Sequence, residues 1–285
     1  MLNKNIETFL GCDNEYDESN IVIFGAPFDS TTSYRPGTRF ASKTMRAESY
    51  GLETYSPYLD LDMEDMAVFD GGDLELSFGN TELALKDIED MTAQILADGK
   101  LPFMIGGEHL VTLGAVRAVA AKYPDLHILH FDAHADLREE YLGARLSHAS
   151  VLHRCWDIVG DGKIFQFGIR SGDREEFRWG KEHVFTHKFD FDGLDEVIEQ
   201  LKGKPVYFTL DLDVLDPSVF PGTGTPEAGG VSFKELLNAI MRVSELDIVG
   251  SDMNELSPML DQSGASTAVA LKLMREWLLK LSAKF

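Results

Sequence analysis

The stretch of sequence that decides the fold runs from residue 101 to residue 131. It begins with the apolar run Leu101-Pro-Phe-Met-Ile105, passes through an amphipathic segment at 110–123, and returns to an apolar run at Leu126-His-Ile-Leu-His-Phe131. Two near-continuous apolar runs joined by a helical segment are typical of parallel strands that are buried on both faces. This stretch therefore predicts one strand–helix–strand unit of an α/β fold.

The same alternation recurs along the rest of the chain. Six more short apolar runs start near residues 21, 67, 163, 183, 205 and 247, and helical patterns occupy 81–97, 192–201 and 232–244. About eight strands fit either an open, doubly wound sheet or a closed barrel, and both place their sites at the carboxyl ends of the strands. Because we find no Pro/Gly/Ser-rich linker and no internal repeat, we predict one domain spanning residues 1–285.

Charge and composition limit the classes of partner. The 285 residues carry a formal charge of −22, which argues against nucleic acid and anionic membranes and favours a cationic ligand. No apolar run approaches the roughly 20 residues of a membrane span, and the first ten residues lack the pattern of a signal peptide, so we predict a cytoplasmic location. Two cysteines, Cys12 and Cys155, make neither a disulfide framework nor a zinc–cysteine site.

Carboxylates and imidazoles follow four of the predicted strands. The relevant segments are Gly106-Gly-Glu-His109, Asp132-Ala-His-Ala-Asp136, Asp211-Leu-Asp213 and Asn254-Glu255. In an extended backbone, alternate side chains point to the same side, which would group Asp132 with His134 and Asp136, and Asp211 with Asp213. Acidic strand ends can simply cap helices or form ion pairs, but so many like charges at one edge call for neutralisation by a divalent cation.

The number and type of these side chains suggest two metal ions. Four aspartates and two histidines exceed the needs of one ion and suit two ions bridged by carboxylates. An oxygen-rich set with imidazole favours Mn²⁺ over structural Zn²⁺, which prefers cysteine and histidine in a closed tetrahedron. We therefore predict two Mn²⁺ ions per subunit.

The combined motifs resemble the ureohydrolase (arginase–agmatinase) family from about residue 24 to the last helix. Further matching pieces are Arg35-Pro-Gly-Thr-Arg39, Phe131-Asp-Ala-His-Ala-Asp-Leu-Arg138, Ser147-His148 and Pro221-Gly-Thr-Gly-Thr-Pro-Glu-Ala-Gly-Gly230. The resemblance implies a three-layer sandwich with an open, mainly parallel sheet covered by helices on both faces. It also implies a binuclear manganese centre that hydrolyses a guanidinium group to urea, and a homo-oligomer, either a trimer or a hexamer.

The resemblance also assigns roles by position. His109, Asp132, Asp136 and Asp211 would hold one manganese, and Asp132, His134, Asp211 and Asp213 the other, with a hydroxide between them as the nucleophile. Asp136 would orient or accept the hydroxide proton, and His148 would carry protons to solvent or to the leaving amine. Glu255 would bind the guanidinium, and Thr225 would contribute to the substrate site or orient Glu255. His130 is expected to be a core residue or to support a ligand.

The loop after the Asp-x-His-x-Asp segment bears on the substrate. It reads Leu137-Arg-Glu-Glu-Tyr-Leu-Gly143, in which Glu139 and Glu140 would repel a carboxylate and suit a ligand whose far end is an ammonium, while the direction of Arg138 is open. Glu139 is the predicted substrate-binding residue of this loop. We therefore predict an agmatinase that converts agmatine to putrescine and urea. The alternatives are a ureohydrolase acting on arginine or another guanidino compound, and a non-catalytic metal-binding relative.

Overall fold

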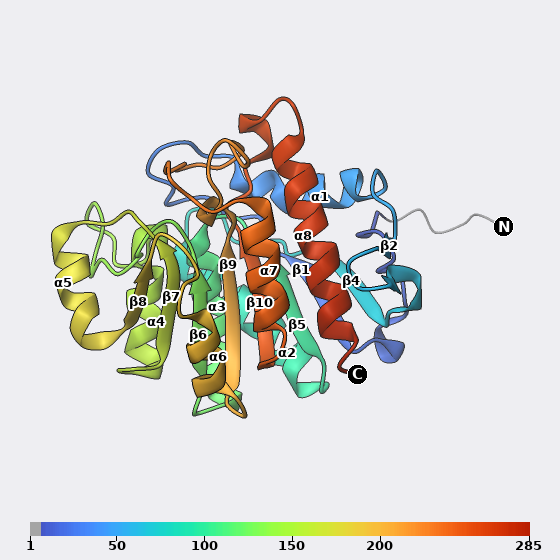
Figure 1. Ribbon diagram of the computed structural model, residues 1–285, viewed down its shortest axis with the longest axis horizontal. Coiled ribbons are helices and arrows are strands. Elements are labelled where there is room, and N and C mark those ends of the chain that lie inside the picture. The colour runs from blue at the N-terminus through green and yellow to red at the C-terminus, as the bar shows by residue number, and fades with distance from the viewer. Residues whose placement is uncertain (1–6) are drawn as a thin grey trace.

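An eight-stranded parallel sheet runs through the middle of the molecule (Figure 1). In this computed structural model, which describes residues 7–285, the strand order is β4-β1-β5-β10-β9-β6-β7-β8. The sheet begins at β4 and ends at β8, so it is open and the barrel alternative is wrong. The strands are β1 Ile21–Gly25, β4 Val68–Asp73, β5 Leu101–Ile105, β6 His127–Phe131, β7 Ile164–Ile169, β8 Phe185–Lys188, β9 Pro205–Asp211 and β10 Asp247–Asn254, with a separate antiparallel pair of β2 Tyr55–Ser56 and β3 Leu61–Asp62.

Helices cover both faces of the sheet, as predicted. One core contains buried side chains of α1, α6, α7 and α8, and Figure 1 shows α7 and α8 on the face of the sheet toward the viewer. The other core contains side chains of α2, α3 and α4, with partly buried residues of α5 packed against it. The helices are α1 Ala41–Ser49, α2 Thr81–Ala97, α3 Thr112–Lys122, α4 Val151–Val159, α5 Arg174–His183, α6 Leu194–Leu201, α7 Phe233–Val243 and α8 Ala265–Ser282.

The apolar runs form strands because both of their faces are buried. In β1, Ile21 and Ile23 belong to the core beneath α7 and α8, whereas Val22 and Phe24 belong to the core beneath α2 and α3. A strand with one solvated face would alternate apolar and polar residues instead. Burial of both faces of the sheet by helices therefore explains both the continuous apolar runs and the three-layer sandwich. The predicted fold class is confirmed.

The strand order brings the predicted site segments together. The four central strands β5, β10, β9 and β6 are neighbours and parallel, so their carboxyl ends share one edge of the sheet. His109 follows β5, Glu255 follows β10, Asp211 ends β9 and Asp132 follows β6. In the register of the sheet, Asn254 pairs with Asp211. Segments more than a hundred residues apart thus meet at one place.

Within residues 7–285, no helix has both the length and the apolar character that crossing a membrane requires. Residues 1–6, which belong to the N-terminal stretch without a signal-peptide pattern, lie outside the described residues.

Candidate metal centre

His109 lies at the centre of three carboxylates. Its Nδ1 is 3.0 Å from Asp132 Oδ2, 3.2 Å from Asp136 Oδ2 and 3.3 Å from Asp211 Oδ2. All four side chains are buried. The predicted ligands of one metal ion therefore converge, from three different strand ends, on one imidazole nitrogen.

His134 marks a second position beside the first. Its Nδ1 lies 3.0 Å from Asp213 Oδ2 and 3.5 Å from Asp132 Oδ1. Asp132 therefore turns one carboxylate oxygen to His109 and the other to His134. Asp132, His134 and Asp213 offer ligand atoms within 4.8 Å of one another, as a metal ion requires. Sharing of Asp132 between two positions is the arrangement expected of a bridging carboxylate.

A hydrogen bond fixes the orientation of His109. Its Nε2 lies 2.9 Å from Thr209 Oγ1, on the side of the ring away from the carboxylates. If Nε2 donates its proton there, Nδ1 presents a lone pair to Asp132, Asp136 and Asp211. Histidine ligands are commonly held in this way by a partner on the other ring nitrogen.

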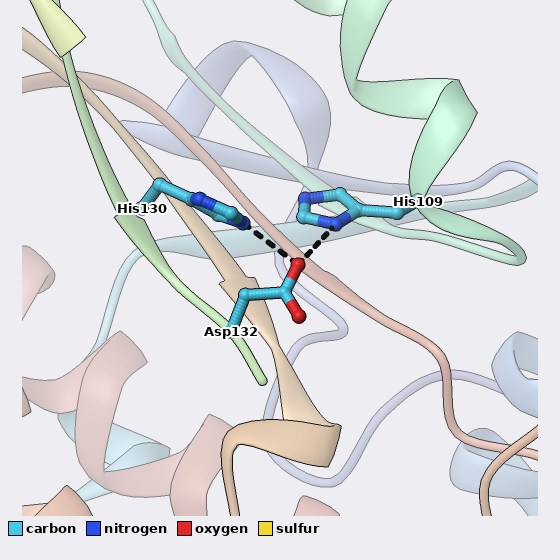
Figure 2. A group of neighbouring side chains, drawn as sticks. All are labelled: His109, His130 and Asp132. Carbon is cyan, nitrogen blue, oxygen red and sulfur yellow. Dashed lines mark hydrogen bonds and ion pairs between the residues drawn. The ribbon is translucent and has the colours of Figure 1, made fainter. Parts of the chain in front are cut away.

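His130 supports the site as a hydrogen-bond donor (Figure 2). Gln166 Nε2 donates to the backbone oxygen of Ala135 at 2.7 Å and lies 3.0 Å from His130 Nδ1, so this ring nitrogen accepts. His130 Nε2 must then carry the proton, and it lies 2.8 Å from Asp132 Oδ2. Figure 2 shows His109 and His130 approaching the same oxygen of Asp132. His130 thus holds a ligand, in line with its predicted supporting role.

The charge of the cluster fits divalent cations. Burial and the charge of Asp132 raise the pKa of Asp136 to about 7, and burial together with Asp213 and Asp132 raises the pKa of Asp211 well above its usual value. Protein groups alone therefore leave these carboxylates poorly neutralised, and a buried carboxylate pair cannot ionise fully without a counter-charge. The residues present fit two divalent ions, because such ions supply that charge.

The backbone at two ligand segments departs from the extended form expected from the sequence. Asp136 has φ +53°, in the left-handed region, and residues 212–214 form a turn of 3₁₀ helix in which Asp211 accepts the Asp213 N–H at 2.9 Å. Glu255 is likewise left-handed, with φ +66°. Non-glycine residues in this region concentrate at functional sites, where the surroundings hold them. The side chains meet as predicted. Turns of the backbone, rather than simple alternation along an extended strand, orient those of Asp136 and Asp213.

A cleft of about 240 Å³ opens above the cluster. His134 and Asp136 lie in its wall together with His148 and Thr225. Burial and the charge of His134 lower the pKa of His148 to about 4, so the imidazole is neutral near pH 7 and can accept a proton. The predicted proton carrier thus borders the same cleft as the predicted ligands.

Glu255 lies beneath the Gly-rich loop that contains Thr225. Its Oε1 accepts the backbone N–H of His109 at 2.7 Å. Gly224 of the loop lies so close to the carboxylate that a side-chain Cβ at this position would be 3.8 Å from Glu255 Oε2. Burial, reinforced by the charges of Asp213 and Glu108, raises the pKa of Glu255 well above its usual value. A cationic partner such as a guanidinium would stabilise its charged form.

Of the three predicted substrate residues, only Thr225 lines the cleft, and its hydroxyl lies 3.5 Å from Asp213 Oδ2. Glu139 is exposed and lines a neighbouring hollow with His153 and Trp179. Its role in substrate binding stays a prediction.

The structure adds acidic residues to the cleft that sequence reasoning missed. Asp173 and Glu176 line it at the start of α5, where Arg138 Nη1 lies 3.0 Å from Asp173 Oδ2 and its Nε lies 3.3 Å from Glu176 Oε2. The spacing Asp-x-x-Glu is a helix capping box, which the structure confirms. That signal marks a helix start and does not reveal that the helix start faces a cleft.

Comparison with known proteins agrees with this geometry. A model of the arginase family matches residues 19–280. A Bacillus anthracis protein named agmatinase is 47% identical over 277 residues, 96% of each chain. The structure described as a putative agmatinase from Clostridium difficile is 55% identical with a TM-score of 0.93, covering 95% of this chain and 99% of that one. That of an agmatine ureohydrolase of Thermoplasma volcanium is 35% identical with a TM-score of 0.89, over 98% and 95%.

The match extends over nine-tenths of the chain and includes every strand of the large sheet that carries the carboxylate cluster. This chain therefore belongs to the arginase family.

Proposed function

We propose that this protein is an agmatinase, which hydrolyses agmatine to putrescine and urea with two Mn²⁺ ions per subunit. Its family consists of hydrolases acting on guanidino compounds. The observation that carries the choice of substrate is the charge of the cleft. Arg138 is the one lysine or arginine among the described residues that line it, and two carboxylates already pair with it.

The proposed chemistry divides between the metal ions and the chain. When bound, two divalent cations would lower the pKa of a water molecule toward neutrality and so supply the nucleophile. Glu255 would pair with the planar guanidinium and hold its carbon above the ligand cluster. Asp136, at the wall of the cleft, would accept the proton of the attacking water. His148, neutral near pH 7, would take up a proton that Asp136 releases and pass it to the leaving amine.

The far end of the substrate distinguishes agmatine from arginine and guanidino acids. Agmatine ends in an ammonium, whereas the other compounds carry a carboxylate. Asp173 and Glu176 together bring two negative charges against one positive charge on Arg138. This balance attracts an ammonium and repels a carboxylate.

The test is urea release by the Mn²⁺-loaded protein from a panel of agmatine, arginine and 4-guanidinobutyrate at equal concentrations. We expect agmatine to give the highest kcat/KM, by at least about tenfold over the other two compounds. A factor of this size corresponds to one substrate carboxylate that the acidic cleft compensates poorly. Turnover of arginine without turnover of agmatine would overturn the proposal in favour of an arginase. Metal binding without turnover of any member would favour the non-catalytic alternative.

A second prediction concerns Asp173. Asp173→Asn keeps a good N-cap for α5 but removes one negative charge from the cleft. We expect KM for agmatine to rise about two- to fivefold with kcat retained, since a partly exposed charge contributes roughly 0.5–1 kcal/mol. Steady-state kinetics at low and high salt check this, and the difference between variant and parent should shrink at high salt. An unchanged KM at low salt would remove Asp173 from the substrate site.

Three further parts of the proposal follow from the family. Manganese as the native metal, a trimeric or hexameric assembly and a cytoplasmic location each remain predictions. Metal analysis of the purified protein and its mass in solution by light scattering test the first two.

A further inference from the structure

The loop after β1 connects a buried glutamate to His148. Glu108 is fully buried, and its carboxylate accepts the backbone N–H of Thr31 at 2.7 Å and the hydroxyl of Thr31. The same hydroxyl oxygen accepts the backbone N–H of His148 at 3.0 Å and lies 3.4 Å from its Nδ1. A continuous chain of contacts thus runs from Glu108 through Thr31 to the imidazole.

The direction of these hydrogen bonds constrains the imidazole. Thr31 has one hydroxyl proton, and it points to Glu108, so only lone pairs of Thr31 face His148. Ser147 Oγ is also 3.4 Å from Nδ1, and it accepts the Ala149 N–H at 3.3 Å as a helix cap. Because Thr31 offers Nδ1 only lone pairs, it favours the tautomer that carries the proton on Nδ1, and Ser147 Oγ can accept from that proton as well. Nε2 then keeps a free lone pair, and it lies 3.1 Å from Ser33 Oγ, which lines the cleft.

We propose that Glu108 and Thr31 are positioning residues, which fix the place and tautomer of His148 so that Nε2 is the nitrogen that exchanges protons with the reactants. This inference rests on the proposed function, in which His148 moves a proton. Glu108 precedes His109 in sequence, but its side-chain hydrogen bonds go to the loop, at Thr31 and Thr32. The carboxylate therefore acts on His148 through the loop.

Thr31→Val tests the inference, because it keeps the shape of the side chain and removes the hydroxyl. We expect kcat to fall about tenfold, which is the loss expected when one hydrogen bond to a functional group is removed. KM and manganese content should stay within about twofold of the parent. Thr31→Ser should restore kcat to within about threefold. If the valine variant folds poorly, Thr31→Ala removes the same hydroxyl without adding an apolar methyl group to the site.

Thr32→Val is the matched control. The Thr32 hydroxyl reaches the same carboxylate, at 3.3 Å from Glu108 Oε2, and makes no contact with His148 among the hydrogen bonds of the described residues. We expect its kcat to stay within about twofold of the parent. An equal loss in the Thr31 and Thr32 variants would show that Glu108 serves only to hold the loop, and would overturn the inference.

A double-mutant cycle separates action through His148 from a general effect. In a His148→Asn background, Thr31→Val should lower kcat no further. Fully multiplicative losses would show that Thr31 acts independently of His148 and would overturn the inference. The rate ratios are measured on whichever guanidino substrate the parent hydrolyses, so failure with agmatine would count against the proposed function alone.

Discussion

Asp211→Asn is expected to abolish both manganese binding and hydrolysis. Asp211 Oδ2 approaches the nitrogen of His109 that faces the carboxylates, and the residue also caps the turn that presents Asp213. Loss of a partner that only orients a metal ligand typically costs 10–100-fold in affinity or activity. Because Asp211 is predicted to bridge both ions, we expect its loss to lower kcat/KM by more than about 100-fold. Metal content by mass spectrometry and urea release measure the two effects.

Asp216→Asn is the matched control, three residues beyond Asp213. Asp216 is partly exposed and accepts hydrogen bonds from Ser218, Gly229 and Gly230, none of which belongs to the ligand cluster. We expect this variant to retain both manganese ions and most of its activity. If Asp211→Asn behaved like Asp216→Asn, the assignment of a binuclear centre would be wrong.

Glu255→Gln is expected to eliminate most of the catalysis while leaving the metal in place. A glutamine oxygen can still accept the His109 N–H, so the substitution chiefly removes the charge that pairs with the guanidinium. Loss of one partner from a buried charge pair costs about 2–5 kcal/mol. This corresponds to a fall in kcat/KM of roughly 30-fold to several thousandfold.

The measurement combines steady-state kinetics on agmatine with metal analysis of the same samples. Glu227→Gln is the control, since Glu227 is a partly exposed glutamate of the neighbouring Gly-rich loop, whereas Glu255 is buried and contacts the backbone of His109. A Glu255→Gln enzyme with the kcat/KM of the parent would exclude Glu255 as the guanidinium partner. Loss of metal from this variant would instead assign Glu255 to the metal centre.

The sequence predicted the strands well because the sheet is buried on both faces. Each central strand then appears as an apolar run, as in Leu101–Ile105, and local composition suffices to find it. The order of the strands does not follow from such runs. β10 inserts between β5 and β9, which pair with it in register, and this placement depends on how all the helices pack.

The convergence of the candidate metal ligands was predictable because these residues end strands and occur in short motifs. Their convergence on His109 and His134 required only that neighbouring strand ends meet at one edge. The left-handed backbone of Asp136 was not predictable, because aspartate adopts that conformation only where its surroundings hold it.

The substrate end of the cleft was harder to predict, because its residues have ordinary local roles. Asp173 and Glu176 form a capping box like that of α7, and nothing in their spacing indicates a binding site. Glu139 follows the ligand segment closely, yet the chain turns it into the neighbouring hollow. Loop direction depends on distant contacts, here between Arg138 and the start of α5, which a local pattern does not contain.

The most direct test of the binuclear centre is anomalous diffraction at the manganese edge from crystals of the Mn²⁺-loaded protein. We predict two peaks per chain, both among the side chains of His109, Asp132, His134, Asp136, Asp211 and Asp213, with Asp132 and Asp211 contacting both. The absence of anomalous density in this cluster, or a single ion held by other residues, would contradict this assignment.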